Sequence, residues 1–192
     1  MKTFNFSKYP LSQFLSVLGS DSPAPGGGSA AALVASLGIA LVEMVARINA
    51  KRNAKNSKNR IDTLRRLRMR AENLITQDAK AFMALSRVFK EARKGGKFQQ
   101  ALKVGARVPL EICEFSSQAL QIALLEKNRT SRWLASDLVE AALLLEAAFG
   151  SGRLNVEINL GQITDKNFVF KIKKRLDFLE HKVKKNARKL SL

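Results

Sequence analysis

Residues 29–51 form a long run of alanine, leucine, valine and isoleucine whose only charge before Arg47 is Glu43. A helix that is apolar on nearly all sides is stable only when other elements cover it. We therefore expect this segment to be a buried helix, and its small residues would let neighbouring helices, or a second subunit, approach closely. Its most apolar part, Ala30 to Val42, has about 13 residues, whereas a membrane span needs about 20. No membrane span is expected.

Helical periodicity recurs through the rest of the chain. Apolar residues spaced three and four apart predict further helices over residues 10–19, 60–92, 98–127, 134–149 and 165–189. Pro109 is expected to kink one of these helices, and Thr164 or Asp165 to cap the last. "GSGR" is expected to end the helix over 134–149, and residues 154–160 alternate in a way that favours a short extended segment. The patterns predict an all-α protein, a bundle of about six helices in a single domain over residues 1–192.

The charge is strongly positive and uneven. The chain has 192 residues, with 34 Lys and Arg against 16 Asp and Glu, and a formal net charge of +18. One basic cluster runs from Arg47 to Arg70, and the other covers the last helix, about 165–189. Such a chain is attracted to polyanions, although lysine-rich solvated helix faces explain the same composition. Nonspecific binding of nucleic acid or another polyanion follows from either interpretation.

The chain has one cysteine and one histidine, which removes several classes of chemistry. Cys113 lies beside Ile112 and close to Phe115, and is expected to be a buried, unreactive side chain. A lone cysteine forms no intrachain disulfide, which favours a reduced, cytoplasmic setting. His181 lies among lysines in the last helix, where a surface position is expected rather than a catalytic one.

Carboxylates inside apolar segments are the candidate chemical groups. Glu43 is expected to pair with Arg47, one helical turn later. Asp78, in "TQDAKAF", either borders a pocket or forms a salt bridge on the flank of its helix. Asp137, in "ASDLVEAA", either caps its helix or acts with Glu140 as one of two carboxylates on a shared face.

Two asparagines and a glycine-rich segment complete the set of candidates. Asn155 and Asn159 are four residues apart, so they either serve their own backbone or bind an amide-rich heterocycle. The segment "SPAPGGGSAA" (22–31) precedes the apolar run. Its glycines either punctuate the chain or expose backbone N–H groups at a helix N-terminus, where an anion binds well.

Five sequence blocks, in their order along the chain, connect these candidate residues to one protein family. The chain resembles the cyclodeaminase/cyclohydrolase family of folate enzymes through "SPAPGGGSAAALVASLGIALVEMVARI", "DAKAF", "VPLEI", "SDLVEAALLLEAA" and "NVEINLGQITDKNF". The resemblance implies an all-helical homodimer that binds folate between its helices. It also implies a reaction at the one-carbon unit bridging N5 and N10 of tetrahydrofolate, as cyclohydrolase or cyclodeaminase. The folate derivative is the substrate, and no cofactor or metal is implied.

The resemblance also assigns roles, residue by residue. It implies that Asp137 and Asp78 are catalytic. It places the following residues in the folate pocket: Gly26, Gly27, Gly28, Ser29, Asn155 and Asn159. The helix over 29–51 is the expected dimer surface. The alternative hypothesis is a helical binding protein without this activity, which uses its basic faces on nucleic acid or another polyanion.

Overall fold

The computed structural model describes residues 4–52, 54, 57–91 and 95–191. Within these ranges it contains six α-helices and two short 3-10 helices, and no strand. The elements are η1 (Phe6–Lys8), α1 (Leu11–Leu18), α2 (Gly27–Arg52), α3 (Ser57–Glu91), α4 (Gly96–Lys127), η2 (Arg132–Leu134), α5 (Ala135–Leu160) and α6 (Lys166–Leu190). The all-α class and the number of helices expected from the sequence are confirmed.

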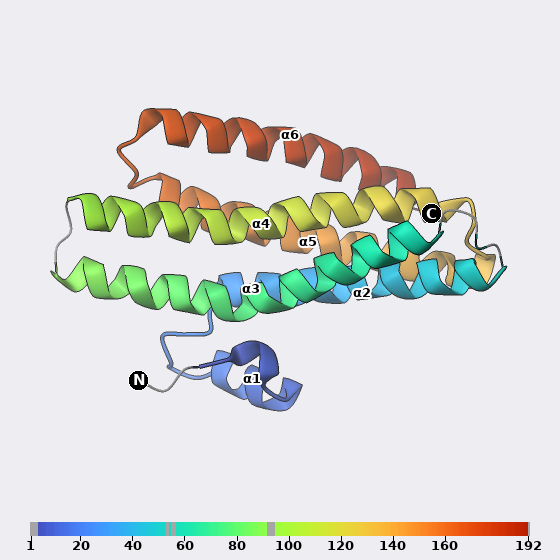
Figure 1. Cartoon of the computed structure of the whole chain (residues 1–192), viewed down its shortest axis with the longest axis horizontal. Helices are drawn as coiled ribbons and strands as arrows, with labels where there is room; N and C mark the ends of the chain where they lie inside the picture. Colours follow the sequence, from blue (N-terminus) through green and yellow to red (C-terminus); the bar gives the residue numbers. More distant parts are fainter. Residues whose placement is uncertain (1–3, 53, 55–56, 92–94, 192) are drawn as a thin grey trace.

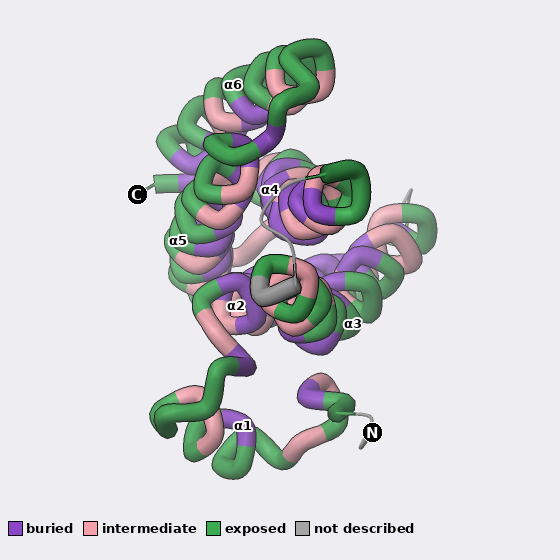
Figure 2. Tube along the Cα trace, turned by 90° about the vertical axis from the view of Figure 1, so that its left-hand side faces the viewer, coloured by how far each residue is buried: buried purple, intermediate pink, exposed green. Residues whose placement is uncertain are grey.

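The four long helices α2 to α5 lie alongside one another along the long axis of the molecule (Figure 1). Helix α6 packs on α4 and α5, and α1 lies beyond the other side of the bundle (Figure 1). Buried positions lie on the side of each long helix that faces the other helices, whereas the outer side of α6 is exposed (Figure 2). The apolar side chains form one continuous core, which fixes how the helices meet.

Helix α2 packs against α3, α4 and α5 at once. Ala32, Ala35 and Ile39 are fully buried, but Leu37 is 50% exposed, so the expected burial on nearly all sides is wrong for one face. The helix has 26 residues, and by length and composition alone it passes as a candidate membrane span. The shorter apolar stretch in the sequence argued against a membrane span on length, but the length of the whole helix does not exclude one. Packing argues against one, because 61% of its most apolar window is buried inside the bundle.

Helix α5 corrects the prediction of an extended segment over residues 154–160. The helix continues from Ala135 through "GSGR" to Leu160. Gly152 is there for packing rather than for chain termination, because a Cβ at this position would lie 2.9 Å from Cys113 Sγ and 3.1 Å from the Pro109 carbonyl oxygen. The small residue lets α5 approach α4 closely, and tertiary contact outweighs the low helix propensity of glycine.

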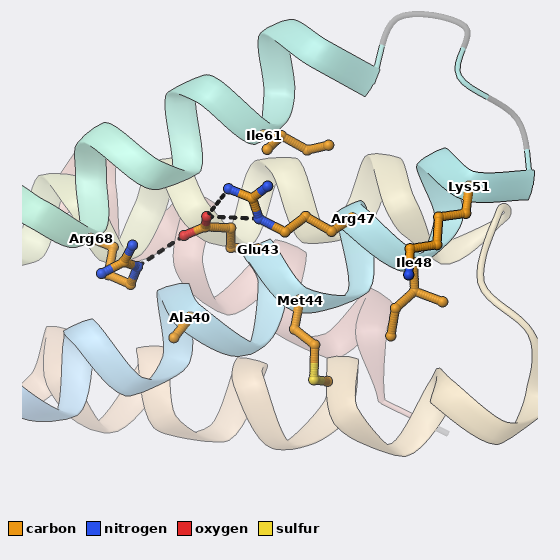
Figure 3. Close-up of a pocket in the computed structure, with 8 residues that line it drawn as sticks. All are labelled: Ala40, Glu43, Met44, Arg47, Ile48, Lys51, Ile61 and Arg68. Atoms are coloured by element: carbon orange, nitrogen blue, oxygen red, sulfur yellow. Dashed lines mark hydrogen bonds and ion pairs between the residues drawn. The ribbon is translucent and has the colours of Figure 1, made fainter.

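Local interactions match three sequence expectations. Asp165 caps α6, since its Oδ1 accepts from the Phe168 N–H at 3.0 Å. Cys113 is fully buried, and burial raises the pKa of its thiol to about 12. Glu43 is buried and accepts hydrogen bonds from Arg47 and, in addition, from Arg68 of α3 at 2.9 Å (Figure 3). The second arginine ties α2 to α3.

The Glu43 carboxylate gives a first testable prediction. Burial raises its pKa, but the hydrogen bonds from Arg68 and Arg47 outweigh burial, and the net pKa lies below the usual value of 4.5. The ionised form therefore stabilises the fold above that pH, and the contribution is lost as the pH falls through the lowered pKa. We expect Glu43→Gln to cost about 2 kcal/mol of unfolding free energy at pH 7, because it weakens the hydrogen bonds from both arginines. The cost is no larger because both arginines are partly exposed to solvent.

Urea denaturation at pH 7 and at pH 3 measures this effect. The difference in unfolding free energy between wild type and Glu43→Gln should be smaller at pH 3 than at pH 7. Glu146→Gln is the matched control, since Glu146 has no hydrogen bond or ion pair among the described residues, and it should change stability by less than about 0.5 kcal/mol. A difference in unfolding free energy between wild type and Glu43→Gln that is the same at both pH values would contradict the ion-pair account.

Candidate active site

One cavity of about 290 Å³ brings together most of the residues singled out from the sequence. It lies between the start of α2, the middle of α3 and α4, and the end of α5. Its lining residues are Pro23, Ala24, Gly26, Gly27, Gly28, Asp78, Ala79, Ala81, Phe82, Leu85, Gly105, Pro109, Asn155 and Asn159. Asp78 is the single charged side chain in this lining, and Asn155 and Asn159 are its other polar side chains.

Asp78 lies against the first turn of α2. The Ser29 hydroxyl is 3.1 Å from Asp78 Oδ2 and 2.9 Å from the Ile75 carbonyl oxygen, and the Ser29 backbone N–H also donates to the carboxylate. Burial raises the pKa of Asp78 above its ordinary value, and the Ser29 hydrogen bonds offset only part of that rise. Asp78 is therefore a carboxyl group whose proton affinity is increased by its position.

Gly28 is required by this contact. A Cβ at Gly28 would lie 2.1 Å from Asp78 Oδ1, whereas nothing lies within 4 Å of a Cβ at Gly26. The helix N-terminus, with its positive dipole, thus stabilises the protein's own carboxylate. An external anion at this point was one of the two interpretations that the sequence left open. The structure instead places Asp78 there.

Asn155 and Asn159 line the opposite wall from α5. Pro109 has no N–H, so the Gly105 carbonyl oxygen four residues earlier lacks its helical partner. Asn159 Nδ2 lies 3.3 Å from that oxygen and 2.9 Å from the Asn155 carbonyl oxygen. Asn155 Nδ2 donates to the Ser151 carbonyl at 2.8 Å. Both amide nitrogens serve the backbone, and neither Oδ1 has a hydrogen-bond partner among the described residues, which leaves two acceptors at the cavity.

The sequence analysis missed several residues of this wall. Phe82 lies four residues after Asp78 on α3, where it is 47% exposed and lines the cavity. Gly105 was not singled out at all. The signal for Gly105 was present, because a proline inside a helix frees the carbonyl oxygen four residues before it. The exposure of Phe82 depends on how α3 and α4 diverge, and no local pattern predicts it.

Asp137 does not belong to this cavity within one chain. It lies in the first turn of α5, and neither it nor Ser136 caps that helix. Asn155 is 18 residues further along the same helix, about 27 Å away at 1.5 Å per residue. Asp137 is partly buried, and no hydrogen bond or ion pair joins it to another residue in the described part of the chain. Glu140, on the same side of α5, is exposed.

A larger cavity, of about 580 Å³, lies elsewhere on α2 and α3. Figure 3 shows its lining, with Glu43 between Arg47 and Arg68, and Met44 pointing away from these ion pairs. None of the candidate site residues lines it. Its carboxylate already accepts from both guanidinium groups, so this cavity is an ion-paired junction between two helices. Among the residues described, no group of three acidic, histidine or cysteine side chains is placed to bind a metal ion.

Comparison with known proteins identifies the family. The model of the formiminotransferase-cyclodeaminase family matches residues 10–178. The chain belongs to this family.

Individual relatives agree with this assignment. The chain is 29% identical to the methenyltetrahydrofolate cyclohydrolase of Methylorubrum extorquens, over 88% of each protein. It is 34% identical to the formimidoyltransferase-cyclodeaminase of Rattus norvegicus over 92% of this chain, but spans only 35% of that longer protein. The crystal structure of formiminotetrahydrofolate cyclodeaminase from Thermotoga maritima superposes with a TM-score of 0.90 at 26% identity, covering 95% of this chain and 94% of that one.

The contact between Gly28 and Asp78 gives a second prediction. We expect Gly28→Ala to cost about 1–3 kcal/mol of stability, because the new methyl group displaces the carboxyl group. Gly27→Ala is the matched control one residue away, since its Cβ would lie 4.0 Å from the nearest atom, Asn155 Nδ2. It should be neutral or slightly stabilising, through the better helix propensity of alanine.

A double-mutant cycle with Asp78→Ala isolates the clash. Thermal denaturation of the single and double variants should show that Gly28→Ala costs much less once the Asp78 side chain is removed. Equal costs in both backgrounds would show that Asp78 does not occupy the space beside Gly28.

Proposed function

We propose that this chain is a folate enzyme that acts on the one-carbon unit bridging N5 and N10 of tetrahydrofolate. The observation that carries the proposal is the cavity itself, where the glycine segment, Asp78 and two asparagines meet in a member of this family. The relatives named as methenyltetrahydrofolate cyclohydrolase and formimidoyltransferase-cyclodeaminase support the same substrate class. Folate is the substrate, and we propose that no further cofactor takes part.

The cavity suits one end of a folate molecule. The free Oδ1 atoms of Asn155 and Asn159 can accept from N–H groups of a planar heterocycle. The exposed ring of Phe82 offers an apolar face for stacking. A volume of about 290 Å³ is at the lower limit for a small-molecule site, so it holds the reacting ring system rather than the whole substrate.

Asp78 is the group we assign to proton transfer. The methenyl carbon is cationic, and a carboxylate beside it stabilises that charge. In the cyclohydrolase reaction water adds to this carbon, gives up a proton, and the ring opens as one C–N bond breaks to give 10-formyltetrahydrofolate. Burial of Asp78 moves its pKa towards neutral pH, which favours accepting the proton from water and returning it to the leaving nitrogen.

The cyclodeaminase reaction passes through the same cationic carbon. Here N10 attacks the formimino carbon, the imine nitrogen takes up one proton from N10 and a second proton from an acid, ammonia leaves, and the methenyl bridge closes. The same carboxyl group would donate that proton and then stand beside the cation that forms. The geometry supports both reactions equally, and we propose that either reaction takes place at the one-carbon bridge. We further propose a homodimeric enzyme in the cytoplasm, with the exposed side of α2 in the dimer contact.

A specific observation favours polyanion binding as a second property. The outer face of α6 exposes Lys171, Lys174 and Lys185, none of which forms an ion pair among the described residues. Phe170 and Phe178 are exposed on the same helix. Cations beside exposed aromatic rings are the combination that binds single-stranded nucleic acid without sequence preference.

The decay of methenyltetrahydrofolate absorbance tests the enzymatic proposal. Wild-type protein should accelerate the decay, or else should form the methenyl absorbance from formiminotetrahydrofolate. Asp78→Asn should lower the rate by about 10²–10⁴-fold, because it removes the proton-transfer group. Asp62→Asn is the control on the same helix, about 24 Å from Asp78, and should keep the wild-type rate. Wild-type protein that accelerates neither reaction would overturn the proposal.

Fluorescence anisotropy of a labelled single-stranded oligonucleotide tests the second property. We expect binding at low salt that weakens steeply as salt is added. Lys174→Glu with Lys185→Glu should weaken it more than Arg65→Glu with Arg66→Glu on α3, which changes the net charge equally. If both pairs of substitutions weaken oligonucleotide binding equally, the oligonucleotide responds to net charge alone and α6 has no binding face.

A further inference from the structure

The part of α4 that lines the cavity contains two residues that are unsuited to the interior of a helix. Gly105 and Pro109 lie four residues apart, and both line the cavity. Glycine and proline have the lowest helix propensities, yet α4 continues past both of them to Lys127. Residues that break a local rule without ending their element are expected at functional sites. This pair is therefore a candidate for a role in the site.

Pro109 creates an acceptor that a neighbouring helix has to pair. With any other residue at this position, its backbone N–H would donate to the Gly105 carbonyl oxygen four residues earlier. Helices α4 and α5 lie side by side (Figure 1). Asn159 Nδ2 of α5 lies 3.3 Å from the freed oxygen and 2.9 Å from the Asn155 carbonyl oxygen. The amide nitrogen of Asn159 therefore faces two backbone acceptors.

Gly105 leaves the space that the same amide occupies. A Cβ at Gly105 would lie 2.8 Å from Asn159 Oδ1 and 3.3 Å from its Cγ. Such distances are too short for a side chain, so any other residue at this position would displace the Asn159 amide. Gly96 at the start of α4 is different, because nothing lies within 4 Å of a Cβ there. The close approach is thus specific to the glycine at the cavity.

These two contacts fix the orientation of the Asn159 amide. If the amide turned by half a rotation, its Oδ1 would take the place of Nδ2, against the two carbonyl oxygens. Three acceptors would then meet without a donor, which is unfavourable for buried polar groups. An asparagine that turns freely accepts or donates as its ligand requires, whereas this one offers only its oxygen. It therefore binds an N–H group and leaves an acceptor unpaired.

We propose that Pro109 and Gly105 determine the specificity of the site by holding Asn159 as a fixed hydrogen-bond acceptor. The inference rests on the proposed function for its ligand, a folate derivative whose 2-amino group gives the pterin ring an edge of N–H donors. A site built to accept a hydrogen bond rejects a ligand that lacks the donor. Pro109 and Gly105 are positioning residues, because both act on the ligand through Asn159.

Pro109→Ala separates this role from a structural one. Alanine restores the backbone N–H, which competes with Asn159 for the Gly105 carbonyl oxygen. The melting temperature should stay at the wild-type value or rise, because a helix breaker is removed. The KM for methenyltetrahydrofolate or formiminotetrahydrofolate, whichever the protein converts, should nevertheless rise about 10-fold, with a much smaller change in kcat. Gly96→Ala is the control on the same helix and should keep the wild-type KM.

The opposite pattern would overturn the inference. A lower melting temperature with an unchanged KM in Pro109→Ala would show a purely structural proline. A double-mutant cycle adds a second check, because Pro109→Ala should change KM by less than about 2-fold in an Asn159→Ala background. An undiminished effect of Pro109→Ala in that background would show that proline does not act through Asn159.

A substrate analogue tests the claim about specificity itself. Replacing the 2-amino group of the pterin ring by a methyl group removes the donor from the ligand and leaves the one-carbon bridge intact. Wild-type protein should bind this analogue about 10-fold or more weakly than the natural compound, because the Asn159 oxygen loses its partner. Pro109→Ala should discriminate less between the two compounds. Equal discrimination by both proteins would contradict the inference.

Nuclear magnetic resonance of the Asn159 side-chain amide tests the same contact without any folate. Its protons, assigned with Asn159→Ala, should exchange with water slowly in the wild type and faster in Pro109→Ala. Gln118, which is exposed on α4, is the reference for rapid exchange. An Asn159 amide that exchanges as fast as Gln118 would overturn the inference whether or not the protein is active. A slowly exchanging amide in a protein that converts neither folate derivative would overturn the proposed function alone.

Discussion

The contact between the Asp78 carboxylate and the first turn of α2 organises the site. Ser29 donates to this carboxylate, and Gly28 leaves room for it. The contact fixes how the start of α2 meets the middle of α3, and it puts a desolvated negative group at the edge of a cavity. A buried carboxylate costs stability. The helix dipole and the Ser29 hydrogen bonds offset part of that cost, and what remains appears as increased proton affinity.

The opposite wall is built by a similar use of backbone groups. Pro109 frees a carbonyl oxygen, and Asn159 satisfies it from another helix. The amide nitrogens are thereby fixed towards the protein, which turns both asparagine oxygens into acceptors for a ligand. The cavity presents acceptors and one carboxylate to whatever enters it. A ligand with N–H donors and a developing positive charge fits that set, and a folate derivative, with N–H groups on its pterin ring and a cationic one-carbon bridge, has both properties.

The sequence was most informative where local chemistry decides the structure. Periodicity and caps predicted six helices, and Asp165 as a cap, because such signals act within a few residues. It failed at "GSGR", where Gly152 packs against Cys113 and the helix continues, since a glycine that ends a helix and one that admits a neighbour look alike in sequence. The meeting of Asp78 with the asparagines was predictable only through family resemblance. Asp137, which the same resemblance placed in the site, instead lies in the first turn of α5, far along that helix from the asparagines.

The protonation of Asp78 tests the central claim most directly. Carbon-13 NMR of aspartate carboxyl groups, titrated with pH and assigned with Asp78→Asn, reports this pKa in the folded protein. The account predicts one carboxyl resonance that titrates above the ordinary aspartate value of 3.8 and is missing in the variant. An Asp78 resonance that titrates at or below that value would show an ordinary ionised side chain, and would contradict its assignment as the proton-transfer group.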